Sequence, residues 1–272
     1  MVIAPMEYFV PQQSVVRAIW GKADTVLFIF AGAAAEFALN KAVDWLYFTG
    51  RLPADPLARL FSTVAYARQI VFAERAGAER AIDTIAAIHS AVEARRGMAI
   101  PDWAYRDVLF MLIDYSIRSF EVLERPLTTA EKEDVFDVFT RVGQRMGIQG
   151  LPTAYTDWLI ARQQHLASDL ENSGFTMDLY QQYRRHLGPL RYWLLLQAQR
   201  LVVPATVIQL LHLSPRSWIT PLLPLYRQTQ HLRVGRWAKA ALLPPAYKAR
   251  ILALDNEPAH FHSPAEAETA KR

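Results

Sequence analysis

The sequence predicts an all-α protein, and three observations lead to that fold class. Apolar residues recur at three- and four-residue spacings along nearly the whole chain, which is the period of an amphipathic helix. Runs of alternating β-branched residues bounded by turn dipeptides, the signal of a strand, are scarce. Proline and glycine cut the chain into pieces of helical length, as in "LPADP" at 52–56.

The first predicted helices alternate with these breaks. Residues 14–22 form a short entry helix, and the apolar stretch 24–48 forms one helix or two. Pro56 suits the first turn of the next helix, over 57–74. The helix that carries His89 ends at Gly97, because glycine favours the left-handed backbone that closes a helix. Another helix covers about 102–124.

The second half of the chain continues the pattern. Thr128 and Glu131 form a capping box, which opens a helix that ends at Gly147. A further helix begins in "LPTAYTDWL" at 151–159 and runs to about 171, and two more cover 176–187 and 189–202. Four prolines, at 204, 215, 221 and 224, then divide the rest into short pieces. Repeats and linkers are not evident. We therefore expect one domain over 1–255, followed by a disordered polar tail over 256–272.

Composition excludes several classes of function. Hydrophobic residues make up 52% of the chain, enough for a sizeable core. The net charge is only +4 and no dense stripe of Lys and Arg is visible, so we expect no nucleic-acid partner. The absence of cysteine excludes disulfides, Fe–S clusters, Zn–thiolate sites and covalently attached haem, and it is consistent with the cytoplasm.

Membrane spans are not predicted either. The N-terminal residues lack a basic region followed by an apolar run. Glu36 interrupts the apolar stretch 25–39, and Arg200 and Pro204 interrupt 193–213. We therefore expect a cytoplasmic protein, and the sequence leaves peripheral contact with a membrane and the oligomeric state open.

Among the histidines, His89 is the candidate for a ligand. Nucleotide-binding glycine loops, a GxSxG elbow, HExxH and local pairs of histidines are all absent. His165 and His186 lie in polar surroundings and are expected to be exposed. His89 instead shares a helix face with apolar residues: Ala78, Ile82, Ile85, Ala86 and Val92. Taken alone, this pattern is typical of a buried core histidine, and a ligand role stays open.

A second helix face combines polar and apolar groups. Arg59, Thr63, Tyr66 and Ile70 recur at spacings of 4, 3 and 4, so they lie on one side of a helix. Such a face suits a flat amphiphile with carboxylates on one edge, with Arg59 for the anionic group and Thr63 for a hydrogen bond. The alternative is an arginine that extends from the first turn into solvent.

The chain resembles a known family in the order of its motifs. These are "DP-x-x-RL-x-x-T" at 55–63, "IAAIH" at 85–89, "PLTTAEKEDVF" at 126–136 and "GIQGLPTAYTDWL" at 147–159, after the entry "VVRAIWGKADTVLFIFAGAAAEFAL" at 15–39. Together they are similar to the catalytic domain shared by MpaB-type oxygenases and bacterial latex-clearing proteins, the rubber oxygenases. The similarity spans roughly 15–250.

The resemblance implies a globin-like, multi-helix domain that encloses a pocket for non-covalent haem b. It implies that His89 matches the proximal iron ligand, and that Arg59 and Thr63 match a conserved pair beside the haem, with cofactor-binding and catalytic roles. The implied reaction is the oxidation of an apolar alkene- or isoprenoid-like substrate with dioxygen. The alternative is a helical protein of the same fold that binds a lipid, an isoprenoid or haem without catalysis.

The chain also departs from the family pattern. Ser62 stands where rubber oxygenases carry a lysine that caps the distal iron, and "ALNKAVDW" at 38–45 stands where many relatives have a His-Pro pair. Asp44 and Glu36 match the position of a proposed base only approximately. Aromatic residues are candidates to line a pocket or to fill the core: Trp45, Phe61, Trp103 and Tyr115.

Overall fold

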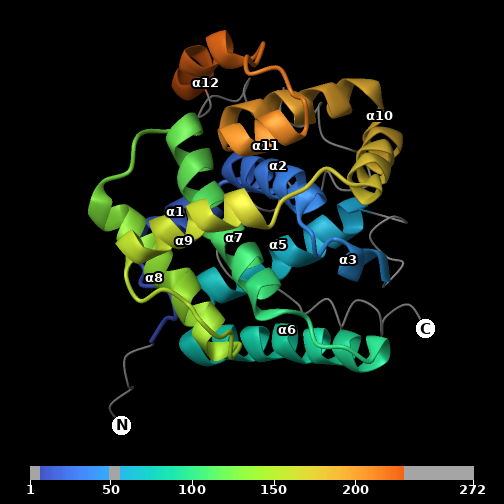
Figure 1. The fold of residues 1–272 in the computed structure, drawn as a ribbon. Coiled ribbons are helices and arrows are strands. Elements are labelled where there is room, and N and C mark those ends of the chain that lie inside the picture. The colour runs from blue at the N-terminus through green and yellow to red at the C-terminus, as the bar shows by residue number, and fades with distance from the viewer. Residues whose placement is uncertain (1–6, 49–55, 230–272) are drawn as a thin grey trace, which may run out of the picture.

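The computed structural model describes residues 7–48 and 56–229, with the side chains of Leu46 and of 56–61 left out. Within this part the protein is helical and has no strand, which confirms the all-α prediction (Figure 1). The helices are α1 Val15–Trp20, α2 Ala23–Leu39, α3 Asp44–Phe48, α5 Pro56–Phe72, α6 Arg75–Arg96, α7 Asp102–Leu123, α8 Thr129–Arg145, α9 Tyr155–Ser168, α10 Gly174–Val202, α11 Ala205–Leu210 and α12 Leu223–Thr229, with a 3₁₀ turn η1 at Thr220–Leu222.

Local sequence signals set several of these boundaries. The capping box of α8 forms, because the Thr128 hydroxyl accepts from the Glu131 amide while the Glu131 carboxylate accepts from the Thr128 amide. Gly97 closes α6 in the left-handed conformation at φ 72°. The predicted break between 187 and 189 is a kink within α10, where Gly188 leaves helical geometry and Pro189 follows.

Helix α2 is the centre of the core. It packs against α7 along its length and against α10 and α11, while α7 also packs against α8 (Figure 1). The close approach of α2 and α7 depends on Gly32, because the ring of Tyr115 occupies the space that a side chain there would need. A Cβ atom on Gly32 would lie 2.3 Å from Cδ1 of Tyr115.

We expect Gly32→Ala to destabilise the protein, even though alanine is the better helix former. The added methyl group must push Tyr115 out of its position, and overpacking of this kind costs about 1–3 kcal/mol, against a gain of about 1 kcal/mol in helix propensity. Urea denaturation should show a lower midpoint. Gly174→Ala is the matched control, since nothing lies within 4 Å of a Cβ atom there; an equal midpoint for both variants would contradict the packing argument.

Three sequence predictions are not tested by this fold. The globin-like arrangement and the enclosed cofactor pocket stay predictions. The boundary between 255 and 256 and the disordered tail lie outside the described residues.

Among the described helices, none has the length and apolar content needed to cross a bilayer.

Candidate functional site

The α5–α6 hairpin places two of the predicted site residues at one level. The helices pack against each other and are joined at Ala73 and Glu74. Arg59 precedes Ala73 by 14 residues and His89 follows Glu74 by 15, from their positions in the chain. At 1.5 Å per residue, both lie about 21–23 Å from the junction, and Thr63 lies about 15 Å from it. Arg59 and His89 therefore lie at similar distances from the junction, on two helices that pack against each other.

His89 lies where the buried face of α6 becomes partly open. The face is fully buried at Ala78 and Ile82, as predicted, but it is only half-buried from Ile85 to Val92. His89 is itself half-buried, and its Nδ1 atom is inaccessible to solvent. The small side chain of Ala86 lies one turn before it. The prediction of a core-facing stripe is therefore confirmed for the first turns of α6 and wrong for the turns around His89.

Tyr105, near the start of α7, packs edge-on against the ring of His89. The two ring centroids lie 5.3 Å apart at an angle of 83°. The Tyr105 hydroxyl donates to Glu93 Oε1 at 3.1 Å, and the Ile100 amide donates to the same oxygen at 2.8 Å. Burial, together with the charge of Glu93, raises the pKa of Tyr105, so the hydroxyl stays protonated. Glu93 thus holds the aromatic ring that orients His89.

The α5 face is confirmed as far as it is described. Thr63 and Tyr66 are half-buried and Ile70 is buried, which agrees with a face that becomes more apolar along the helix. The Arg59 side chain lies outside the described residues, so its role as an anion-binding group stays a prediction.

Helix α3 approaches the same side of α6. Arg96 follows His89 by seven residues, which places both on one face of α6, two turns apart. Its guanidinium lies 4.0 Å from the ring centroid of Trp45 and donates to Asp44 Oδ2 at 2.6 Å. Trp45 and Asp44 therefore flank the half-buried face, and the carboxylate of Asp44 is held in an ion pair.

A buried polar network in the core was missed by sequence analysis. Arg162 of α9 forms a two-pronged ion pair with Glu36 of α2, including Nη2 to Oε2 at 2.6 Å. It also donates from Nη2 to Asp114 Oδ2 at 2.9 Å. The Tyr115 hydroxyl donates to Glu36 Oε2 at 2.6 Å. Side-chain exposure is 3% for Arg162 and 0% for Glu36. Together with Asp114 and Tyr115 of α7, this ion pair links α2, α7 and α9 within the core.

His165 extends this network, and the prediction that it is exposed was wrong. Its side chain is 2% exposed. Nε2 lies 3.0 Å from Glu36 Oε1, and Nδ1 lies 2.7 Å from Asp107 Oδ1 and 3.3 Å from Asp169 Oδ2. The polar neighbours of His165 in sequence were interpreted as a solvent-facing surface, but they include Arg162 and Asp169, which share its helix face at spacings of 3 and 4.

The charges in the network support one another. Burial alone would raise the pKa of Glu36, but the charge and hydrogen bonds of Arg162, His165 and Tyr115 outweigh it and lower that pKa to about 2. Burial alone would lower the pKa of His165, but hydrogen bonds and charges from Asp107 and Glu36 raise it to about 9. Both groups are therefore ionised at neutral pH.

Asp107, His165 and Asp169 also have the donor types of a metal site. The geometry instead favours a proton, because a 2.7 Å separation of Nδ1 and Oδ1 is a charge-assisted hydrogen bond. Both ring nitrogens of His165 face carboxylates, as an imidazolium requires. Both oxygens of Glu36 are engaged by Arg162, Tyr115 and His165, so this network joins helices within the core.

These pKa shifts give an expected dependence of stability on pH. His165 has a raised pKa in the folded state, so its contribution to the free energy of unfolding is full below pH 6.5 and is lost as the pH rises through about 9. Glu36 has a lowered pKa, so its contribution is present above pH 4.5 and is lost as the pH falls toward about 2. Urea midpoints measured across pH should therefore decline on both sides. His165→Gln should flatten the alkaline decline and His186→Gln should not; an unchanged decline in His165→Gln would contradict the assignment.

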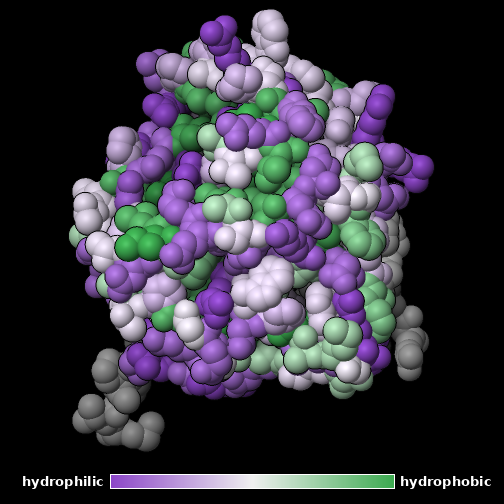
Figure 2. Space-filling model, viewed as in Figure 1, coloured by the Kyte–Doolittle hydropathy of each residue, from purple (hydrophilic) through white to green (hydrophobic). Residues whose placement is uncertain are grey.

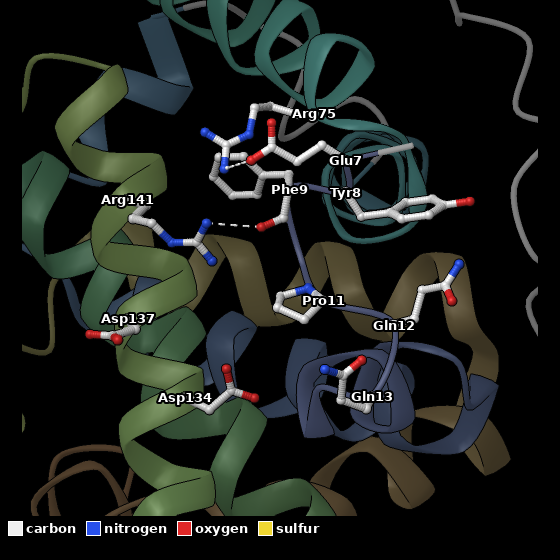
Figure 3. Close-up of a pocket in the computed structure, with 10 residues that line it drawn as sticks. All are labelled: Glu7, Tyr8, Phe9, Pro11, Gln12, Gln13, Arg75, Asp134, Asp137 and Arg141. Atoms are coloured by element: carbon white, nitrogen blue, oxygen red, sulfur yellow. Dashed lines mark hydrogen bonds and ion pairs between the residues drawn. The ribbon is translucent and has the colours of Figure 1, made fainter. Parts of the chain in front are cut away.

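A surface pocket lies far from His89, at the other end of α6. It has a volume of about 690 Å³ and is lined by Glu7, Tyr8, Phe9, Pro11, Gln12, Gln13, Arg75, Asp134, Asp137 and Arg141. Figure 3 shows two interactions between lining residues: Arg75 is paired to Glu7, and Arg141 donates to the Phe9 carbonyl. Arg75 and His89 are 14 residues apart on α6, or about 21 Å. The pocket is therefore separate from the α5–α6 site.

Comparison with known proteins identifies the family. No curated protein and no solved structure matches the chain. The family model described as "ER-bound oxygenase mpaB/B'/Rubber oxygenase, catalytic domain" matches residues 19–255. That range contains the α5–α6 hairpin and the buried network. The chain belongs to the family of MpaB and rubber oxygenase catalytic domains.

Proposed function

We propose that the protein is a haem b-dependent oxygenase that acts with dioxygen on an apolar substrate of the alkene or isoprenoid class, with His89 as the iron ligand. The observation that carries the proposal is the place of His89. In a chain of an oxygenase family, its imidazole lies on a half-buried apolar face of α6, the helix that packs against the predicted site helix α5. A cytoplasmic location stays a prediction from the absence of cysteine.

The described residues around His89 are compatible with a haem. The chain has no cysteine, so a haem iron must be held by another donor, and a neutral imidazole is the commonest one. Ile85, Ala86 and Val92 offer an apolar surface that is neither closed off nor fully exposed. Because Nδ1 of His89 is buried, we assign Nε2 to the iron.

The roles of the protein side chains follow from this placement. Bound haem would supply the iron chemistry of dioxygen. Tyr105 packs on the edge of the His89 ring and restricts its rotation, and Glu93 fixes Tyr105 in turn. Arg59 would pair with the haem carboxylates and Thr63 would donate a hydrogen bond on the same side. Asp44 is the better candidate for a base than Glu36, because its ion pair with Arg96 is partly exposed.

Absorption spectroscopy followed by oxygen uptake tests this function. Protein expressed with haem available should show a Soret band, and it should then consume oxygen with squalene as the probe, in the presence of a reductant. A colourless protein that does not take up added haem would overturn the proposal. A Soret band without oxygen uptake on squalene or related alkenes would favour a haem-binding protein without catalysis.

A further inference from the structure

The positive charge of the chain is concentrated in one long segment. Residues 179–254 contain no Asp or Glu, and they carry eleven basic residues: Arg184, Arg185, Arg191, Arg200, Arg216, Arg227, Arg233, Arg236, Lys239, Lys248 and Arg250. The remainder has 30 − 11 = 19 basic and 26 acidic residues, a net charge of −7. The modest overall charge of +4 therefore conceals a strongly polarised protein.

The described part of this segment forms one end of the molecule. It comprises most of α10, then α11, η1 and α12, which lie together at the top of Figure 1, away from α6 at the bottom. Arg184, Arg185 and Arg216 are exposed here. Arg227 is exposed too, and it donates to the backbone carbonyl of Val122 at 2.8 Å.

Large apolar side chains are exposed in the same segment as these arginines. We name as the α10–α12 surface the residues Leu190, Trp193, Trp218, Leu222 and Leu225, which are 60%, 42%, 79%, 58% and 59% exposed. Figure 2 shows hydrophobic atoms among hydrophilic ones over this end of the molecule. Single exposed apolar residues are ordinary, but two tryptophans and three leucines within one acid-free segment are not.

The surface is held in place by a buried amide. Gln197 of α10 is 1% exposed, and its Oε1 accepts from the Trp218 amide at 2.8 Å. Its backbone carbonyl accepts from the Ser217 hydroxyl at 3.1 Å. Trp193 lies one turn before Gln197 on α10, so these bonds hold Trp218 close to Trp193. The backbone at Trp218 is therefore anchored to α10.

We propose that the α10–α12 surface docks the protein on an anionic lipid bilayer. Tryptophan favours the boundary between headgroups and acyl chains, and the leucines would enter the apolar layer. The exposed arginines of the same segment match the negative potential of anionic headgroups, and each should raise the affinity about fivefold near the surface. The segment itself carries no carboxylate that would repel anionic headgroups. This proposal is independent of the haem site.

Vesicle binding by the full chain tests the surface. The protein should cosediment with vesicles of phosphatidylcholine and phosphatidylglycerol far more than with phosphatidylcholine alone, and added salt should weaken the binding. Trp218→Ser/Leu222→Ser should lose the binding. Arg184→Gln/Arg216→Gln should weaken it about 25-fold, since 1 kcal/mol is about fivefold.

Matched controls separate this surface from general stickiness. Ile160 of α9 is 61% exposed, so Ile160→Ser removes a comparable apolar group elsewhere. Arg80 and Arg95 are exposed on α6, and Arg80→Gln/Arg95→Gln removes the same charge at the other end. Both controls should bind as the parent does. Equal binding to the neutral vesicles, or no loss in Trp218→Ser/Leu222→Ser, would overturn the proposal. So would self-association or oligonucleotide binding through these residues with no vesicle binding.

Discussion

His89→Ala is expected to abolish the Soret band of the haem-loaded protein. A haem with no covalent attachment to the protein depends on its axial ligand for tight binding, and the chain has no cysteine that could replace the imidazole. The substitution should leave the fold intact, because His89 is half-buried and alanine favours a helix by about 0.5 kcal/mol. The measurement is the Soret absorbance after haem titration, with the urea midpoint recorded on the same sample.

Two further variants make the His89 result specific. His186→Ala removes an exposed histidine of α10 and should keep the full Soret band. His89→Gly with added imidazole should recover part of the absorbance, because free imidazole can occupy the space of the missing ring. Haem binding by His89→Ala at the parent's affinity, with an unchanged spectrum, would assign the iron to another residue.

The helices could be predicted because their signals are local. The capping box at Thr128 and Glu131, the glycine stop at Gly97 and the Gly188–Pro189 kink each involve residues close in sequence. The α5–α6 hairpin also follows from two helices and a two-residue junction. These parts of the fold and site needed no knowledge of long-range packing.

The buried network could not be predicted in the same way. Its members lie at positions 36, 107, 114, 115, 162, 165 and 169, and only their meeting in the core gives each one a partner. Glu36 within an apolar run was interpreted as an interruption of a membrane span, although a carboxylate in a buried helix must have a cation beside it. The face shared by Arg162, His165 and Asp169 was the available signal.

Arg162→Met should cause the largest loss of stability of any single change considered in this protein. The substitution keeps the size of the side chain but leaves the carboxylates of Glu36 and Asp114 buried without their main cation. Breaking a buried ion pair from one side costs about 3–5 kcal/mol, which is a large part of a typical free energy of unfolding of about 5–15 kcal/mol. Urea denaturation at neutral pH measures it.

The acid side of the pH profile distinguishes a lost ion pair from a lost packing contact. Without Arg162, burial raises the pKa of Glu36 with less opposition, so Glu36 takes up a proton at mildly acidic pH. Protonation removes the uncompensated buried charge. The loss of unfolding free energy relative to the parent should therefore be smaller at mildly acidic pH than at neutral pH. Arg145→Met removes an exposed arginine whose partner Asp83 lies 2.7 Å away, and it should change little at any pH. Glu36→Gln/Arg162→Met should cost less than the sum of its single changes, because it removes both charges of the pair. If Arg162→Met instead unfolds at the midpoint of Arg145→Met, the network does not join α2, α7 and α9 in the way described.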